Sequence, residues 1–77
     1  MEIDDDIREQ FSYVNDIPDE GRKNFARVAA ALMEAAQTIR NCTPASADQT
    51  LALQHLVDAR MRANKAIAHG GRSFSRR

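Results

Sequence analysis

Apolar residues recur at helical spacing in three segments of this chain, and short polar stretches separate them. In the first segment Ile3, Ile7 and Phe11 stand four residues apart, which places them on one face of an α-helix. Carboxylates at the start of this segment suit the positive end of a helix dipole. The pattern predicts a short helix over about residues 2–12.

Two longer segments follow with the same periodicity. Apolar residues at three- and four-residue spacing predict a helix over about residues 19–41, and Pro44 is expected to end it by restricting the residue before it. A further run over about residues 46–69 begins with Ser46 and Gln49, which have the spacing of a capping box at a helix start. The apolar stripe of the second helix consists of Phe25, Val28, Ala29, Leu32, Ala36 and Ile39.

These segments predict an all-α fold, in which a short N-terminal helix packs on an antiparallel hairpin of two long helices. Residues 1–69 are expected to form a single helical domain, and residues 70–77 a basic, flexible tail. A chain of 77 residues buries only a small core, and a bare hairpin leaves one side of each apolar stripe in contact with water. We therefore expect a homo-oligomer that covers the rest.

Two polar residues fall near the centre of the apolar stripe on the third helix, namely Arg60 and Asn64. An unpaired buried charge costs several kcal/mol. Arg60 therefore needs a carboxylate, a ligand phosphate, or an edge where its stem packs while its head stays in water. Asn64 is expected to fix packing register or oligomeric state, as polar residues do in helical seams. The sequence leaves these alternatives open.

The charges are divided unevenly along a chain whose formal net charge is zero. Residues 1–20 hold eight acidic side chains and one base, Arg8, whereas residues 21–77 hold three acids and ten bases. Either the acidic N-terminal part folds over the basic body, or the body binds an anion.

Several function classes find no support in the residues. The single cysteine, Cys42, excludes an internal disulfide framework, and no spacing typical of a zinc site is present. No nucleophile with a base, no paired carboxylates and no metal shell are spelled out, so we expect no enzyme, no cofactor and no metal. No apolar run is long enough for a membrane span and no signal peptide is evident, so we expect a cytoplasmic protein without a membrane partner.

Anion binding has more in its favour, because aromatic and cationic residues lie close together in the N-terminal third. Phosphate is bound by clustered Arg and Lys side chains, and a nucleobase stacks on an aromatic ring. Phe11 continues the Ile3 and Ile7 face, which favours a core position, whereas Tyr13 lies off that face and is the better stacking candidate. The candidate ligand-binding residues are Phe11, Tyr13, Arg22, Lys23 and Arg27, with Arg60 and Asn64 on the third helix.

The chain resembles the anti-CBASS "sponges", small phage proteins that sequester the cyclic oligonucleotide signals of bacterial CBASS immunity. Near its start it has F-x-Y, then a Pro-containing turn and a basic helix. Near its end it has P-x-S, an acidic residue, LAL, a further leucine and A-x-x-x-A-N-x-A-I-A. These positions are Phe11, Tyr13, Pro44, Ser46, Asp48, Leu51 to Leu53, Leu56, Ala59, Ala63, Asn64 and Ala66 to Ala68.

The resemblance implies a helical protomer that assembles into a hexamer and binds cyclic dinucleotides between protomers, beneath their N-terminal segments. Some members hold cyclic trinucleotides in a separate pocket where three protomers meet. Carried over by position, Tyr13 would stack on a base, and Lys23 or Arg27 would contact the phosphodiester. Assigning Arg60 or Arg62 to a second pocket rests on the stripe geometry and not on a matched motif. The implied site of action is the cytoplasm of the infected bacterial host.

Two other functions remain open on the sequence. One is a helical-hairpin module that binds another protein, with Arg60 and Asn64 serving assembly only. The other is a small nucleic-acid-binding protein that uses the basic tail. Long nucleic acid is the less expected partner, because its phosphates would meet the eight carboxylates of the N-terminal part.

Overall fold

The computed structural model describes residues 1–11 and 19–69, and all secondary structure within these ranges is helical. Three helices follow one another along the chain: α1 is Asp5–Phe11, α2 is Asp19–Cys42 and α3 is Ala47–His69. The expected all-α fold with three helices is confirmed. The expected flexible tail at 70–77 lies outside the described residues.

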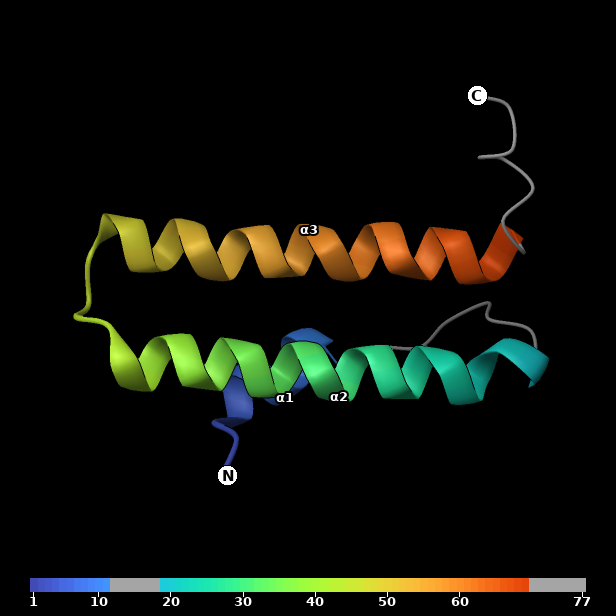
Figure 1. The fold of residues 1–77 in the computed structure, drawn as a ribbon, viewed down its shortest axis with the longest axis horizontal. Helices are drawn as coiled ribbons and strands as arrows, with labels where there is room; N and C mark the ends of the chain where they lie inside the picture. Colours follow the sequence, from blue (N-terminus) through green and yellow to red (C-terminus); the bar gives the residue numbers. More distant parts are fainter. Residues whose placement is uncertain (12–18, 70–77) are drawn as a thin grey trace.

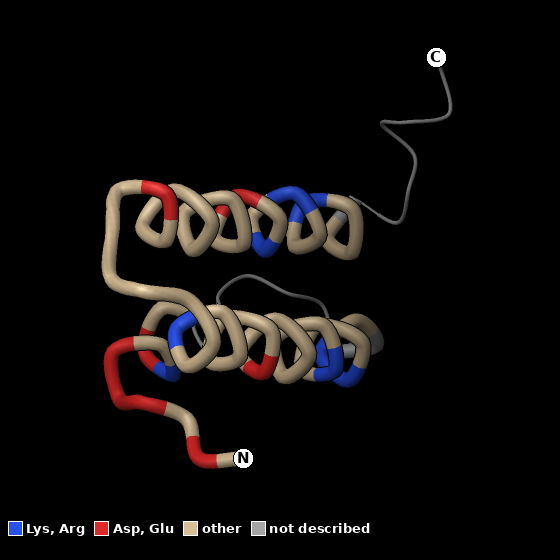
Figure 2. The backbone as a smooth tube through the Cα atoms, turned by 60° about the vertical axis from the view of Figure 1, so that its left-hand side comes forward, with Lys and Arg blue, Asp and Glu red and all other residues tan. Residues whose placement is uncertain are grey.

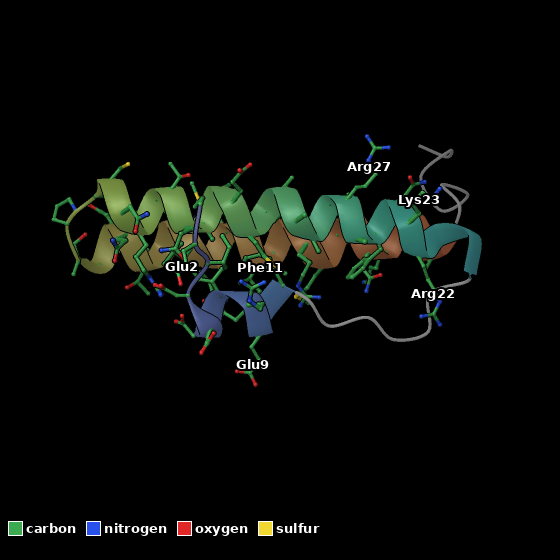
Figure 3. All side chains as sticks on the ribbon, turned by 90° about the horizontal axis from the view of Figure 1, so that it is seen from below. Glu2, Glu9, Phe11, Arg22, Lys23 and Arg27 are labelled. Carbon is green, nitrogen blue, oxygen red and sulfur yellow. The ribbon has the colours of Figure 1, made fainter. Side chains whose placement is uncertain are left out.

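The two long helices form an antiparallel hairpin, and α1 lies against the half of α2 that is nearer the connection (Figure 1). With 24 residues in α2 and 23 in α3, each helix is about 35 Å long at 1.5 Å per residue. Because the helices run in opposite directions from a short connection, the first half of α2 lies beside the second half of α3. Seen from below, α1 packs on one side of this hairpin (Figure 3).

The connection between α2 and α3 is held by side-chain hydrogen bonds. Ser46 Oγ accepts a hydrogen bond from the backbone N–H of Gln49 at 3.1 Å, as a residue at a helix N-cap does. The Gln49 side chain does not complete a capping box. Instead its Nε2 donates to the carbonyl oxygens of Arg40 and Thr43 at 3.3 and 3.0 Å, because the last carbonyls of a helix lack partners within the helix.

Helix α1 begins at Asp5, three residues later than the apolar pattern alone suggested. Asp4 stands at its N-cap, since the Asp4 carbonyl accepts the first helical hydrogen bond from the Arg8 N–H at 3.0 Å. The Asp4 backbone N–H donates a hydrogen bond to the side chain of Gln37 on α2, so it makes no hydrogen bond within a helix. The start of α1 is therefore joined to α2 by a tertiary hydrogen bond.

The core consists of two small clusters. In the first, Ile7 and Phe11 of α1 meet Ala36 of α2, and all three are at most 1% exposed. In the second, Phe25 and Ala29 of α2 pack with Ile67 of α3. Phe11 is thus a core residue, as its place on the α1 face predicted. The predicted apolar stripe of α2 supplies three of these buried side chains.

Helix α3 is covered much less than α2. None of its residues from 47 to 68 is buried in the protomer, although Leu53, Leu56 and Val57 pack against the first cluster. Leu51 and Met61 are more than half exposed. The incomplete cover agrees with the expectation that further copies of the chain pack on this helix, and assembly stays a prediction.

Candidate functional site

Lys23 and Arg27 form an exposed pair of cations near the start of α2. They lie four residues apart, which brings them within about 40° of each other around the helix, and both side chains project away from α1 (Figure 3). Neither has a hydrogen-bonded or ion-paired carboxylate among residues 1–11 and 21–68, the side chains that the structure describes. The structure therefore brings these two predicted phosphate ligands together on one surface.

Arg22 points in a different direction. Its side chain is directed to the side of α2 on which α1 lies, whereas Lys23 and Arg27 project from the opposite side (Figure 3). Consecutive residues of a helix are about 100° apart, so Arg22 and Lys23 do not share a face. The structure thus separates Arg22 from Lys23 and Arg27, although the sequence had grouped the three residues as candidate phosphate ligands.

The hairpin topology adds a second source of positive charge at the same end. Lysine and arginine lie towards the end of α3 that is far from the connection, beside the start of α2 (Figure 2). This end of the hairpin, which we call the open end, is the part of the protomer best suited to a phosphate-bearing ligand. Its described basic residues are Arg22, Lys23, Arg27, Arg60, Arg62 and Lys65.

The two aromatic candidates cannot be treated alike. Phe11 is 1% exposed and packs with Ile7 and Ala36, so its ring is inside the protomer core. Tyr13, the predicted stacking residue, lies outside the described residues. Phe11 is the last residue of α1, and Tyr13 follows it two residues later in the sequence.

Arg60 and Asn64 lie one turn apart on α3 and are both half-buried. The Nε atom of Arg60 and the Oδ1 atom of Asn64 are buried and have no hydrogen-bond partner in the described parts of the chain. Buried polar atoms in native proteins are nearly always satisfied, so this donor and this acceptor mark a place where none of the described residues supplies the partner.

An ion pair was one of the three alternatives for Arg60, and no described carboxylate of the same protomer forms one with it. A carboxylate of another copy, a ligand phosphate and an edge position at a subunit seam stay predictions.

A set of contacts that the sequence did not single out joins the acidic N-terminus to α2. Arg40 donates from Nη1 to Asp4 Oδ2 and to Asp6 Oδ1, both at 2.9 Å, and from Nη2 to Asp6 Oδ2 at 3.0 Å. The hydrogen bonds from Arg40 hold the pKa of Asp6 below its usual value, and the two carboxylates raise that of Arg40. Among the described residues, Asp4 and Asp6 of the acidic N-terminal part thus pair with one base of the body, Arg40, which is one of the two arrangements that the uneven charge had suggested.

One hollow of about 370 Å³ lies on the outer face of α3, lined among the described residues by Asp58, Met61, Arg62 and Lys65. The Asp58 carboxylate opposes phosphate binding there.

No group of three possible metal ligands gathers within the described ranges, and none of the described helices is apolar over a length that could cross a bilayer.

A comparison with protein-family models matched the Acb2/Tad1 hairpin domain over residues 3–68. The comparisons with curated proteins and with solved structures gave no match. The matched range includes all three helices except the last residue of α3. The chain therefore belongs to the Acb2/Tad1 hairpin domain family, the anti-CBASS cyclic oligonucleotide sponges.

Proposed function

We propose that this protein binds cyclic di- and trinucleotide signals and sequesters them without cleaving them, and so suppresses CBASS-type immunity in the cytoplasm of the infected bacterial host. The observation that carries the proposal is the family match over residues 3–68. Sequestration acts by mass action, because it lowers the free signal below the concentration that the host effector requires.

The paired cations Lys23 and Arg27 support this proposal chemically. A cyclic dinucleotide presents phosphodiester anions on a compact ring, and an ammonium and a guanidinium on one helix face offer several donors to such an anion. In the proposed site these two residues contact phosphate and Tyr13 stacks on a base. Arg22 points to the side of α2 on which α1 lies (Figure 3), so it would meet the ligand from another direction, and Phe11, which is buried, would contribute by holding α1 in place.

The partly covered α3 supports assembly of several copies. None of its residues at 47–68 is buried in the protomer, and the family resemblance implies a hexamer. We propose that copies of this chain pack on α3, and that Arg60 and Asn64 gain partners there or in a second pocket that takes cyclic trinucleotides. Enclosure between subunits would supply the tight binding that a sponge needs.

Calorimetric titration of the protein with cyclic GMP–AMP tests the proposal. We expect saturable binding, and after heat denaturation of the complex we expect the ligand to be recovered intact. Recovery of a linear product would show an enzyme, and the absence of heat with cyclic di- and trinucleotides alike would favour a module that binds another protein. A thermal-shift panel of the same ligands is an independent check, because a ligand of the native state raises Tm.

Single charge removals localise the site. Lys23→Gln and Arg27→Gln are each expected to weaken binding about tenfold or more, since hydrogen bonds to charged groups contribute about 1.5–3 kcal/mol. The matched control is Arg8→Gln, which removes an exposed cation of α1, outside the open end. Equal losses in all three variants would indicate a general effect of net charge and would remove the α2 pair from the site.

A further inference from the structure

The N-terminal segment is attached to α2 through one buried amide. Gln37 is 3% exposed and is the one buried polar residue of the described ranges. Its Oε1 accepts the backbone N–H of Asp4 at 2.7 Å, and its Nε2 lies 3.4 Å from Asp4 Oδ2 and 3.1 Å from Asn41 Oδ1. One side chain therefore contacts both the main chain and the carboxylate of the residue at the N-cap of α1.

Arg40 extends this attachment by one turn of α2. Its guanidinium takes both oxygens of the Asp6 carboxylate in a two-pronged arrangement and also contacts Asp4. A bidentate pair of this kind constrains direction as well as distance, because the planar guanidinium and the planar carboxylate must align. We call Gln37, Arg40, Asp4 and Asp6 together the α1 clamp.

The clamp acts at the start of α1, and the apolar core acts along the rest of it. Ile7 and Phe11 bury their side chains against Ala36, but apolar burial is not directional and by itself permits α1 to slide or rotate on α2. Hydrogen bonds to Asp4 and Asp6 fix the remaining freedom. Helix α1 is thus held at both ends in the unliganded protomer.

We propose that Gln37 and Arg40 are positioning residues of the ligand site: they hold α1 against α2, so that the N-terminal segment is placed for its ligand before the ligand arrives. This inference rests on the proposed function together with the family resemblance, which implies that a cyclic dinucleotide lies between protomers, beneath their N-terminal segments; the segment meant here is residues 1–11. A segment that is docked in advance loses less conformational freedom on binding, and the apparent affinity is not reduced by a population of undocked protomers.

The first variant is Arg40→Gln, with Arg8→Gln as the matched control, because Arg8 is an exposed arginine of α1 that lies outside the clamp. Hydrogen exchange of the α1 amides reports docking without any ligand, and calorimetry with cyclic GMP–AMP reports affinity. We expect Arg40→Gln to speed α1 exchange and to weaken binding about fivefold, the upper end for partly exposed ion pairs. Arg40→Lys, which keeps one charged contact, should recover part of both effects.

The second variant is Gln37→Glu, which keeps the size of the side chain but replaces the Nε2 donor beside Asp4 Oδ2 by a charged oxygen. It should undock α1 more strongly than Arg40→Gln and weaken binding about tenfold or more, because a buried charge is left facing a like charge. Its control is Gln54→Glu, the same change at an exposed position of α3. Association of the ligand should slow in the clamp variants, since fewer protomers are ready to bind.

The outcomes separate this inference from the proposed function. Faster α1 exchange together with unchanged affinity and association rate would overturn the positioning role and leave the clamp a purely structural contact. Unchanged α1 exchange in both clamp variants would overturn the docking argument itself. If the wild-type protein binds no cyclic di- or trinucleotide, the proposed function fails and the positioning role fails with it, whatever the exchange data show.

Discussion

Replacing Phe11 by alanine is expected to detach α1 from the hairpin. The Phe11 ring is 1% exposed and packs with Ile7 and Ala36 in the larger of the two core clusters. Its removal takes away the burial of the ring and leaves a cavity that these neighbours fill only in part. Substitutions of buried phenylalanine by alanine cost about 3–5 kcal/mol.

That loss is large compared with the stability of so small a protein. Native domains are stable by roughly 0.05–0.15 kcal/mol per residue, which for 77 residues is roughly 4–12 kcal/mol. Most of what holds α1 is in the affected cluster, whereas Phe25 and Ala29 pack with α3 at the other end of α2. We therefore expect α1 to lose its structure first and the hairpin to unfold at a lower denaturant concentration.

Urea unfolding followed by circular dichroism measures the total loss, and hydrogen exchange of α1 amides locates it. Phe11→Leu is the conservative variant and should cost less than about 1.5 kcal/mol. Leu51→Ala, at a side chain that is 55% exposed, is the control for an apolar residue outside the core. A Phe11→Ala protein within about 1 kcal/mol of wild type would refute the core position described above.

The same variants decide between the two predicted roles of Phe11. If the ring serves only the core, Phe11→Leu should bind cyclic GMP–AMP as wild type does, because leucine restores most of the buried volume. A loss of affinity in Phe11→Leu at unchanged stability would instead show that the ring contacts the ligand.

Three further predictions follow from single contacts. Ser46→Ala removes the oxygen that caps α3 and should lower the free energy of unfolding by about 1 kcal/mol; urea titration measures it, and no loss would exclude the cap. Arg40 lowers the pKa of Asp6 below 3.8, so the contribution of Asp6 to stability is present above that pH and is lost as the pH falls through the folded-state pKa. Unfolding from pH 6 to 2 should therefore show a smaller acid-dependent loss in Asp6→Asn; an identical profile would contradict the pairing. Asn64→Leu removes a buried oxygen without a partner in the described residues and should leave Tm unchanged or raised while light scattering shows an altered oligomer mass; a lower Tm at unchanged mass would contradict the seam role.

The helices themselves were readable from the sequence, because helical periodicity is a local property. The spacing of Ile3, Ile7 and Phe11 placed their side chains on one face, and two of the three are buried in the fold. The sequence predicted one of the two side-chain interactions at the connection between α2 and α3. Ser46 caps α3 as its position indicated, but Gln49 reaches carbonyls of α2 and the connection that only the folded hairpin brings near.

The α1 clamp was not readable to the same extent. An acidic N-terminus was expected to meet the basic body, but which of ten bases it meets depends on where α1 docks, which is a tertiary property. Gln37 gave no charge signal at all, and its role follows from burial and from its bonds to Asp4. By contrast, the divergence of Arg22 from Lys23 and Arg27 follows from helical phase and could have been derived from the sequence.

The hydrogen bonds of Gln49 have a mechanical consequence for the far end of the molecule. Two rigid helices joined at one end act as levers, and over a length of about 35 Å a change of about 5° in their angle moves the free ends by about 3 Å. Gln49 joins the first turn of α3 to Arg40 and Thr43 at the pivot of these levers. The spacing between the cations of α2 and those of α3 at the open end is thus set in part by an uncharged side chain near the opposite end of the hairpin, so that evolution could tune the width of the open end by substitutions that never approach it.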